Sequence, residues 1–219
     1  MESERYHLRE LEIAQDPRST RHLLPPISAD DRDILDIGCG AGQTLIASKL
    51  SRDQRAVGVD VDASALSLGN QLDGSLFLIC AGAERLPFAA DVFDVAIARV
   101  SLPYTDIPAA LREIRRVLKP DGRCWLTLHP MSMGINACVR HVLRGQFKGA
   151  LFQLYALLNG LSLHLLGRLF AFPFATPRRM ESCQTQHGME RALRASGFET
   201  MQVQRGRHFV VTARRARIT

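Results

Sequence analysis

The sequence lacks several features that assign a protein to a class at once. The segment Met1–Glu12 has no continuous apolar run of the kind that forms a secretory signal. The five cysteines are far apart and form no C-x-x-C pair, which argues against a zinc site or a disulfide framework. No internal repeat or low-complexity segment is present. We therefore expect a cytoplasmic protein with reduced thiols and no bound metal.

Length and composition are those of an ordinary globular protein. The chain has 219 residues, of which 46% are hydrophobic and 23% are charged. This length suits one well-buried domain with one insertion, and it is short for two independent domains. We predict a single domain over residues 1–219.

Charge is distributed unevenly along the chain. Residues 1–139 hold 15 Lys+Arg and 19 Asp+Glu, a net charge of −4, whereas residues 140–219 hold 13 and 3, a net charge of +10. A basic C-terminal third is typical of proteins that meet nucleic acid, lipid head groups or phosphorylated substrates. The alternative is a solvated surface rich in arginine.

Strand and helix signals alternate between Asp33 and His129. Short apolar runs predict five strands, at residues 34–37, 56–60, 76–80, 93–98 and 124–129. Helical patterns lie between them, at residues 44–50, 63–70 and 107–118, the last ended by a turn at 119–122. Repeated strand–helix units of this length predict a parallel sheet with right-handed crossovers.

The end of the chain predicts one more helix and two strands. The helix covers residues 187–196, and the strands cover residues 198–204 and 208–213. Arg205-Gly206-Arg207 between the two strands indicates a hairpin. The predicted fold is therefore α/β and Rossmann-like, a doubly wound, mostly parallel seven-stranded sheet with an antiparallel last strand.

A glycine-rich loop, Asp36–Gly42, joins the first strand to the first helix. Glycines there allow a tight turn and let a ligand lie against bare main chain. Asp60 ends the next strand, where a carboxylate can accept hydrogen bonds from a ribose diol. The nicotinamide fingerprint G-x-G-x-x-G needs a third glycine, but Gln43 or Leu45 stands at that position. The loop is instead D-x-G-x-G-x-G.

Five segments follow one another in a regular order along residues 34–129. They are Ile34–Gly42, Val57–Asp60, Ala83–Phe88, Phe93–Ala96 and Glu113–Gly122. In this order and spacing they resemble the class I S-adenosylmethionine-dependent methyltransferases, in the branch that acts on small molecules and lipids. The resemblance implies S-adenosylmethionine as cofactor and S-adenosylhomocysteine as product.

The resemblance also implies roles for individual residues along the cofactor. The methionine end and the ribose would lie near Asp36, Gly38, Cys39, Gly40 and Gly42. The ribose hydroxyls and the adenine ring would meet Asp60, Val61, Ala83 and Glu84. Arg99 would face the methionine end or the mouth of the acceptor site. The alternatives are a helix-capping or strand-end role for Asp60 and a surface or ion-pair role for Arg99.

Two positions depart from the family pattern. Gly82 stands where members of the family often carry an acid that reaches the adenine amino group, so Glu84 or a main-chain group would have to replace it. Asp121-Gly122 replaces a Gly-Gly pair, a mild change because aspartate tolerates turn conformations.

Methyl transfer from a sulfonium needs positioning and desolvation more than a set of catalytic groups. His129, at the carboxyl end of the fifth strand, is the candidate base for a hydroxyl acceptor. The alternative is a strand-end histidine that only makes hydrogen bonds. Tyr104 and Asp106 are predicted to border the same cleft on the acceptor side, or else to form a turn around Pro103.

Residues 131–180 contain no strand signal and are rich in leucine and phenylalanine. Residues 149–167 carry no charge and could just span a bilayer. A small or polar stripe at helical spacing favours packing against the protein body instead, and its members are Gln153, Ala156, Gly160, His164 and Gly167. We predict a helical insertion at 131–180 that caps the acceptor pocket, with residues 170–174 continuing its apolar wall. The alternatives are a dimer interface or additional core.

An apolar cap over the pocket predicts a small, hydrophobic or lipid-like acceptor, such as a lipid, a quinone or a polyketide-like molecule. Cations beside the segment predict peripheral contact with anionic membrane, and they are Arg140, Arg144, Lys148 and Arg168. One rival is an RNA methyltransferase of the tRNA type, although no appended RNA-binding module is present. The other is a regulatory protein that binds the cofactor without catalysis. The sequence leaves the acceptor atom and the oligomeric state open.

Overall fold

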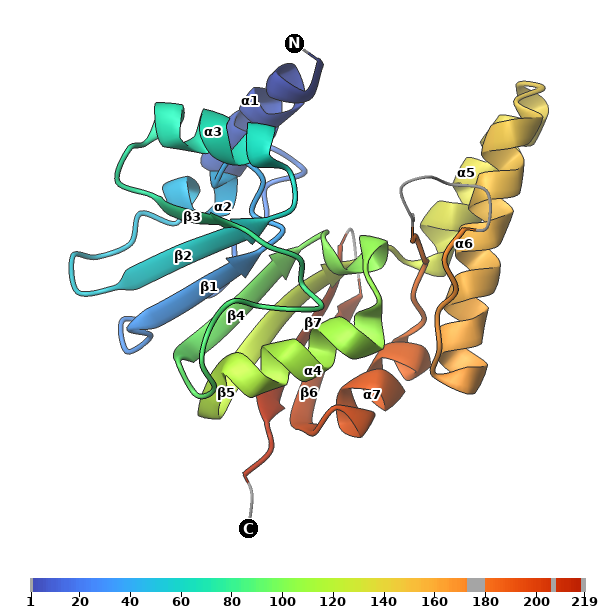
Figure 1. Ribbon diagram of the computed structural model, residues 1–219. Helices are drawn as coiled ribbons and strands as arrows, with labels where there is room; N and C mark the ends of the chain where they lie inside the picture. The colour runs from blue at the N-terminus through green and yellow to red at the C-terminus, as the bar shows by residue number, and fades with distance from the viewer. Residues whose placement is uncertain (1, 173–179, 206–207, 218–219) are drawn as a thin grey trace.

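Seven strands pair into one sheet in the order β3-β2-β1-β4-β5-β7-β6 (Figure 1). The computed structural model describes residues 2–172, 180–205 and 208–217. The strands are β1 (Asp33–Ile37), β2 (Arg55–Asp60), β3 (Phe77–Cys80), β4 (Phe93–Arg99), β5 (Leu118–Leu128), β6 (Phe198–Arg205) and β7 (Phe209–Arg215). All neighbours are parallel except those of β7, which is antiparallel to both β5 and β6. The predicted fold class and the antiparallel last strand are confirmed.

Helices flank both faces of this sheet. They are α1 (Glu2–Gln15), α2 (Gln43–Ala47), α3 (Ala63–Leu72), the 3-10 turn η1 (Leu102–Tyr104), α4 (Ile107–Val117), α5 (Met131–Leu143), α6 (Phe147–Leu166) and α7 (Gln186–Ala195). One face of the sheet packs against α4 and α7 in the larger hydrophobic cluster. The other face packs against Leu45 of α2 and against Leu23 and Ile27 of the segment before β1.

Side-chain caps begin three of the helices. Asp62 accepts from the amides of Ser64 and Ala65 at the start of α3. Asp106 accepts from Ala109 N at 3.2 Å in α4, and Thr185 caps α7 in the same way. These caps satisfy amides that have no partner within the helix.

The fifth strand begins earlier than predicted. β5 starts at Leu118 instead of residue 124, because Leu118 pairs with Phe93 before a register shift, and its carbonyl accepts a hydrogen bond from Arg215. The turn expected at 119–122 survives as a distortion within the strand, where Asp121 takes a left-handed φ of 64°. Residues 206–207 of the predicted hairpin turn between β6 and β7 lie outside the described residues.

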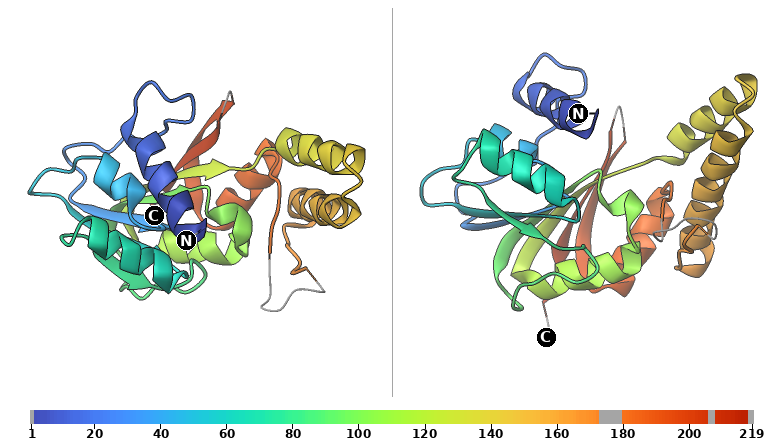
Figure 2. Two further views of the ribbon diagram at one scale, coloured as in Figure 1. Left: turned by 90° about the horizontal axis from the view of Figure 1, so that it is seen from above. Right: turned by 45° about the horizontal axis from the view of Figure 1, so that its top comes forward.

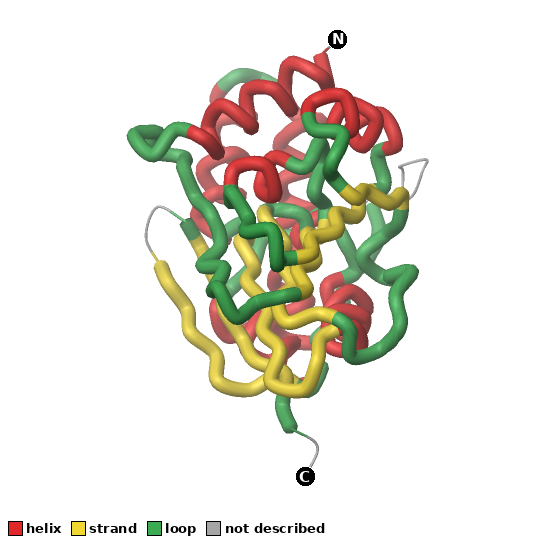
Figure 3. The backbone as a smooth tube through the Cα atoms, turned by 90° about the vertical axis from the view of Figure 1, so that its left-hand side faces the viewer, coloured by secondary structure: helices red, strands yellow, loops and turns green. Residues whose placement is uncertain are grey.

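The carboxyl ends of the parallel strands lie on the side of the sheet where α1 is placed (Figures 1 and 3). No helix is predicted at these residues from the sequence pattern. The C-terminus leaves from the opposite edge, as Figure 3 shows from the side. Side chains at the carboxyl ends of β1, β2, β4 and β5 therefore gather on the side of α1.

Helices α5 and α6 form an antiparallel hairpin beyond α7 and β6, outside the sheet (Figure 2). The predicted small and polar stripe of α6 faces the protein: a Cβ on Gly160 would collide with the Cys183 carbonyl, and His164 Nδ1 lies 2.8 Å from Thr185 Oγ1. Gly167 ends α6 with a left-handed φ of 68°. By length and hydropathy alone α6 could cross a membrane.

Candidate functional site

Three left-handed glycines shape the loop after β1. Gly38, Gly40 and Gly42 have φ values of 69°, 56° and 75°, which residues with a Cβ rarely adopt. The amides of Gly38 and Cys39 both donate to Val59 O, at 2.7 and 3.0 Å, so the loop is tied to the end of β2.

A serine not singled out in the sequence holds the same loop from the other side. Ser101 Oγ donates to Ile37 O at 2.5 Å, and a Cβ on Gly38 would collide with the Ser101 side chain. The Cys39 side chain is buried, packs against Gly58 of β2, and donates through Sγ to Gly40 O at 3.6 Å. The glycine at position 38 is thus required by space as well as by backbone conformation.

Asp36 is a buried carboxylate without a hydrogen-bond partner. Its side chain is 1% exposed, and neither carboxylate oxygen has a partner among the described residues. Burial raises the pKa of Asp36 to about 7, with Arg99 opposing that shift and Asp60 adding to it. An orphaned carboxylate is costly unless a donor or cation completes it. The protonated amino group of a methionine moiety is such a partner.

Asp60 links the loop to the end of β2. One oxygen accepts from Gly40 N at 2.7 Å, and the other accepts from Asp62 N at 2.9 Å. The next residue, Val61, is 74% exposed although it is apolar. A carboxylate followed by an uncovered apolar side chain suits a ribose diol and the flat face of a base.

The predicted adenine edge is present only in part. Ala83 is buried, and Glu84 is exposed and directs Oε1 to the amide of Asp106 at 2.9 Å. Glu84 therefore ties the segment before β4 to the loop after it, while the carboxylate of Asp106 caps α4. The predicted place of Asp106 beside the acceptor cleft stays a prediction.

Helix α1 supplies contacts that sequence reasoning missed. Glu10 pairs with Arg99 at 3.7 Å and also with Arg21. His7 Nδ1 lies 2.9 Å from Gln43 Nε2, directly after the glycine loop. Arg99 is thus held by an ion pair with α1, in line with one of the alternatives for it, and it acts on Asp36 as well. The repeated acids and bases of the first 12 residues gave no local signal for these long-range contacts.

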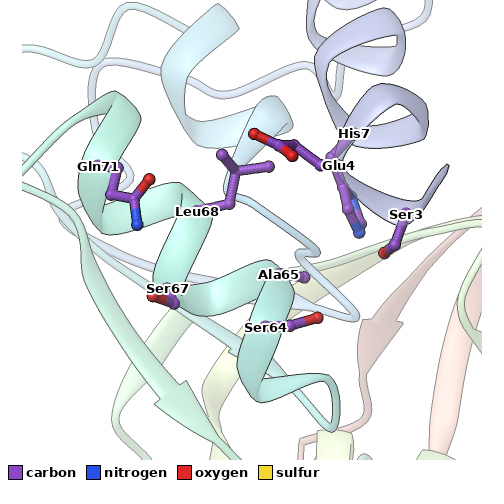
Figure 4. Close-up of a pocket in the computed structure, with 8 residues that line it drawn as sticks. All are labelled: Ser3, Glu4, His7, Ser64, Ala65, Ser67, Leu68 and Gln71. Carbon is purple, nitrogen blue, oxygen red and sulfur yellow. The ribbon is translucent and has the colours of Figure 1, made fainter. Parts of the chain in front are cut away.

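A pocket of about 320 Å³ opens between α1 and α3, as Figure 4 shows. Ser3, Glu4 and His7 line it from α1, and Ser64 and Leu68 line it from α3. The predicted ribose and adenine residues are not among those that line it, and Ser64 is the lining residue nearest to Val61 in the chain.

His129 lies on the acceptor side of the sheet edge. Its main-chain amide donates to Gln184 Oε1 at 3.0 Å, and its ring meets the ring of Tyr104 edge-on at 5.4 Å. Burial lowers the pKa of His129, so the imidazole is neutral near pH 7. Its Nδ1 is buried and has no hydrogen-bond partner within the described part of the chain. A neutral, buried ring nitrogen can accept a proton.

A pocket of about 460 Å³ lies where β4 and β5 end and α5 begins, and its lining includes the two neighbours of His129 in the chain, Leu128 and Pro130, but not His129 itself. Its apolar lining comes from Val100, Leu128, Pro130, Met133 and Phe209. Its polar lining comes from Thr127, Ser132, Asn136, Arg140 and His208. Helix α5 therefore borders this pocket, whereas α6 contributes no lining residue among those described. The capping role of the whole insertion stays a prediction.

The sequence of this chain is similar to those of known methyltransferases. A family described as "Methyltransferase domain" matches residues 35–126. The ubiquinone/menaquinone biosynthesis C-methyltransferase UbiE of Vibrio parahaemolyticus is 37% identical over 125 residues, which cover 50% of this chain and 48% of the relative. The mitochondrial arginine-hydroxylase NDUFAF5 of Danio rerio is 37% identical over 91 residues, 40% of this chain and 28% of the relative. The chain thus spans about half or less of the curated relatives it matches.

Solved structures agree on the fold. A SAM-dependent methyltransferase of Methanosarcina mazei superimposes with a TM-score of 0.59 at 19% identity, over 88% of this chain and 98% of that chain. The glycine loop, Asp36 and Asp60 all lie inside the matched residues 35–126. Residues 35–126 thus match a methyltransferase domain family, and the described chain has the fold of a solved SAM-dependent methyltransferase.

Proposed function

We propose that the protein transfers a methyl group from S-adenosylmethionine to a small, apolar or lipid-like acceptor. The observation that carries the acceptor class is the pocket at the ends of β4 and β5, because five apolar and five polar residues line it and would suit an acceptor with an apolar body and a polar group. The name of the Vibrio relative, which places it in ubiquinone and menaquinone biosynthesis, supports an acceptor of this kind.

The chain has a group for each part of the cofactor. When bound, S-adenosylmethionine supplies a methyl group on a positively charged sulfur. Asp36 would receive the amino group of the methionine end, and Asp60 would exchange its present amide contacts for the ribose hydroxyls. Val61 would cover the adenine ring.

The acceptor side would act by position and by excluding water. Transfer requires the acceptor atom in line with the bond that breaks, so the protein gains most by holding the two partners together. Burial lowers the pKa of His129, and its Nδ1 has no hydrogen-bond partner among the described residues, so the ring would take the proton of a hydroxyl acceptor that reaches it. The Tyr104 ring packs against the His129 ring at a right angle.

A label-transfer assay tests the proposal. The protein is incubated with methyl-labelled S-adenosylmethionine and a total cell extract, and the products are separated into organic, aqueous small-molecule and RNA fractions. We expect the label in the organic fraction. Label in RNA, or in water-soluble products alone, would contradict the acceptor class.

A pair of variants separates the cofactor site from general damage. Asp60→Asn keeps the shape of the side chain but removes its charge at the loop, so we expect labelling and binding of S-adenosylhomocysteine to fall together. Asp73→Asn is the matched control, because Asp73 is a turn acid at the far end of α3. Full labelling by Asp60→Asn would refute the assignment of the cofactor site.

A further inference from the structure

The outer face of α6 is an uninterrupted apolar stripe. Its residues recur at alternating steps of four and three, the spacing of one helix face, and they are Phe147, Leu151, Leu154, Leu158, Leu161 and Leu165. Each of them is between 44% and 75% exposed. Soluble monomers seldom leave so long an apolar surface uncovered.

Helix α5 adds a second apolar surface to the hairpin. Ile135, Val139, Val142 and Leu143 are each at least half exposed, and Leu143 reaches 82% at the end of the helix. The apolar surface therefore extends over both helices and the turn that joins them.

The opposite face of α6 packs against the rest of the protein. Ala156, Asn159, Gly160 and Leu163 are buried, and Asn159 Nδ2 donates to the carbonyls of Glu181 and Phe170 at 2.9 and 3.1 Å. A helix held in this way can offer only one side to an apolar medium. This favours a helix that lies along an interface over one that crosses a bilayer.

Charge on the hairpin has a single sign. Residues 122–180 contain no aspartate or glutamate. Arg140, Arg144 and Lys148 are exposed around the turn between α5 and α6, and Arg168 follows the other end of α6. The apolar stripe is thus flanked by cations at both ends.

A second copy of the chain is the competing occupant, since a stripe of this spacing could form a helix–helix seam. Helix pairs of that kind use opposite charges beside the seam to choose their partner. With no acid on either helix, two hairpins would bring cation against cation at both ends in either orientation. Charge complementarity instead favours an anionic surface.

We propose that the α5–α6 hairpin docks this protein on an anionic lipid surface, with α6 lying in the plane of the membrane. The stripe enters the apolar boundary, while the four cations meet the head groups. Docking does not depend on the acceptor proposed above, because lipid binding needs no turnover. Since α5 also lines the pocket beside His129, docking would bring that pocket to the membrane surface.

Vesicle co-sedimentation tests the proposal with the intact chain. We expect binding to vesicles of phosphatidylcholine with phosphatidylglycerol, weak binding to phosphatidylcholine alone, and a loss of binding as salt is raised. The double variant Leu151→Glu/Leu158→Glu should bind the anionic vesicles at least about tenfold more weakly, because it places two anions in the stripe. Equal binding by wild type and this variant would overturn the proposal.

Two controls complete the experiment. Phe77→Glu changes an aromatic side chain of matching exposure on the edge strand β3, at the other end of the sheet, and should keep vesicle binding. S-adenosylhomocysteine binding checks that all variants are folded. A dimer in solution that the double variant converts to monomer would also overturn the proposal, because the stripe would then belong to a second copy.

Discussion

The buried carboxylate of Asp36 makes cofactor binding depend on pH in a predictable direction. Its pKa of about 7 means that about nine-tenths of these groups are ionised at pH 8 and about one-tenth at pH 6. Only the ionised form attracts the protonated amino group of the ligand. We therefore expect the affinity for S-adenosylhomocysteine to fall about tenfold from pH 8 to pH 6, measured by titration calorimetry.

The stability of the ligand-free protein should fall as pH rises, whereas the affinity for the ligand should rise. Because the folded-state pKa of Asp36 is raised from 3.8, the folded protein holds this proton more tightly than the unfolded chain does. The stabilisation is therefore complete at low pH and is lost as pH rises through about 7. Between pH 6 and pH 8 the loss is about 1.4 kcal/mol in the free energy of unfolding, which denaturant titration at the two pH values can measure.

Asp36→Asn removes the titrating group, so neither the ligand affinity nor the free energy of unfolding should then change between pH 6 and pH 8 through this position. At pH 8 the variant should bind the ligand more weakly than the wild type does. Asp73→Asn is the control, because hydrogen bonds from Ser75 lower the pKa of Asp73, so that it stays ionised over this range. If wild-type affinity does not vary between pH 6 and pH 8, or if Asp36→Asn keeps the wild-type slope, Asp36 does not hold the amino group.

Three further substitutions probe the loop, the N-terminal helix and the acceptor side. Gly38→Ala should abolish ligand binding and should destabilise the protein more than Gly145→Ala does. Gly145 has a similar φ but open space around its Cα, so its substitution should cost only about 1–2 kcal/mol in the free energy of unfolding, measured by thermal unfolding. Equal losses of stability would refute the steric argument. Glu10→Gln breaks the pair with Arg99 and should lower ligand affinity, whereas Glu12→Gln, exposed on the same helix, should not. His129→Asn should leave ligand affinity unchanged and lower kcat about 10²–10⁴-fold for a hydroxyl acceptor; unchanged kcat would leave it a structural residue.

The strands and the glycine loop could be predicted because their signals are local. The apolar run Ile34–Ile37 ends in glycines, and Asp60 follows a second run at the distance that a strand–helix–strand unit requires. Helix α1 could not be predicted in this way. Its place depends on His7 and Glu10 meeting Gln43 and Arg99, and such long-range contacts leave no trace in the pattern of neighbouring residues.

The insertion shows the same limit from another side. The stripe through Ala156 and Gly160 predicted correctly which face of α6 packs on the protein. The helical spacing does not predict what covers the remaining face, because an acceptor pocket, a second copy and a membrane all favour leucine. The described structure brings α5 to the pocket and leaves the stripe of α6 outside it.

The position of β7 between β5 and β6 has a consequence for biosynthesis. β6 has no other neighbour in the sheet, so it cannot dock until β7, which follows it in the chain, has left the ribosome. Helix α7, which packs against the larger cluster, directly precedes β6. The α5–α6 hairpin is therefore synthesised before the part of the sheet beside it can close. During that interval its apolar surface is exposed to chaperones and to a nearby bilayer, so targeting and folding would compete for the same segment.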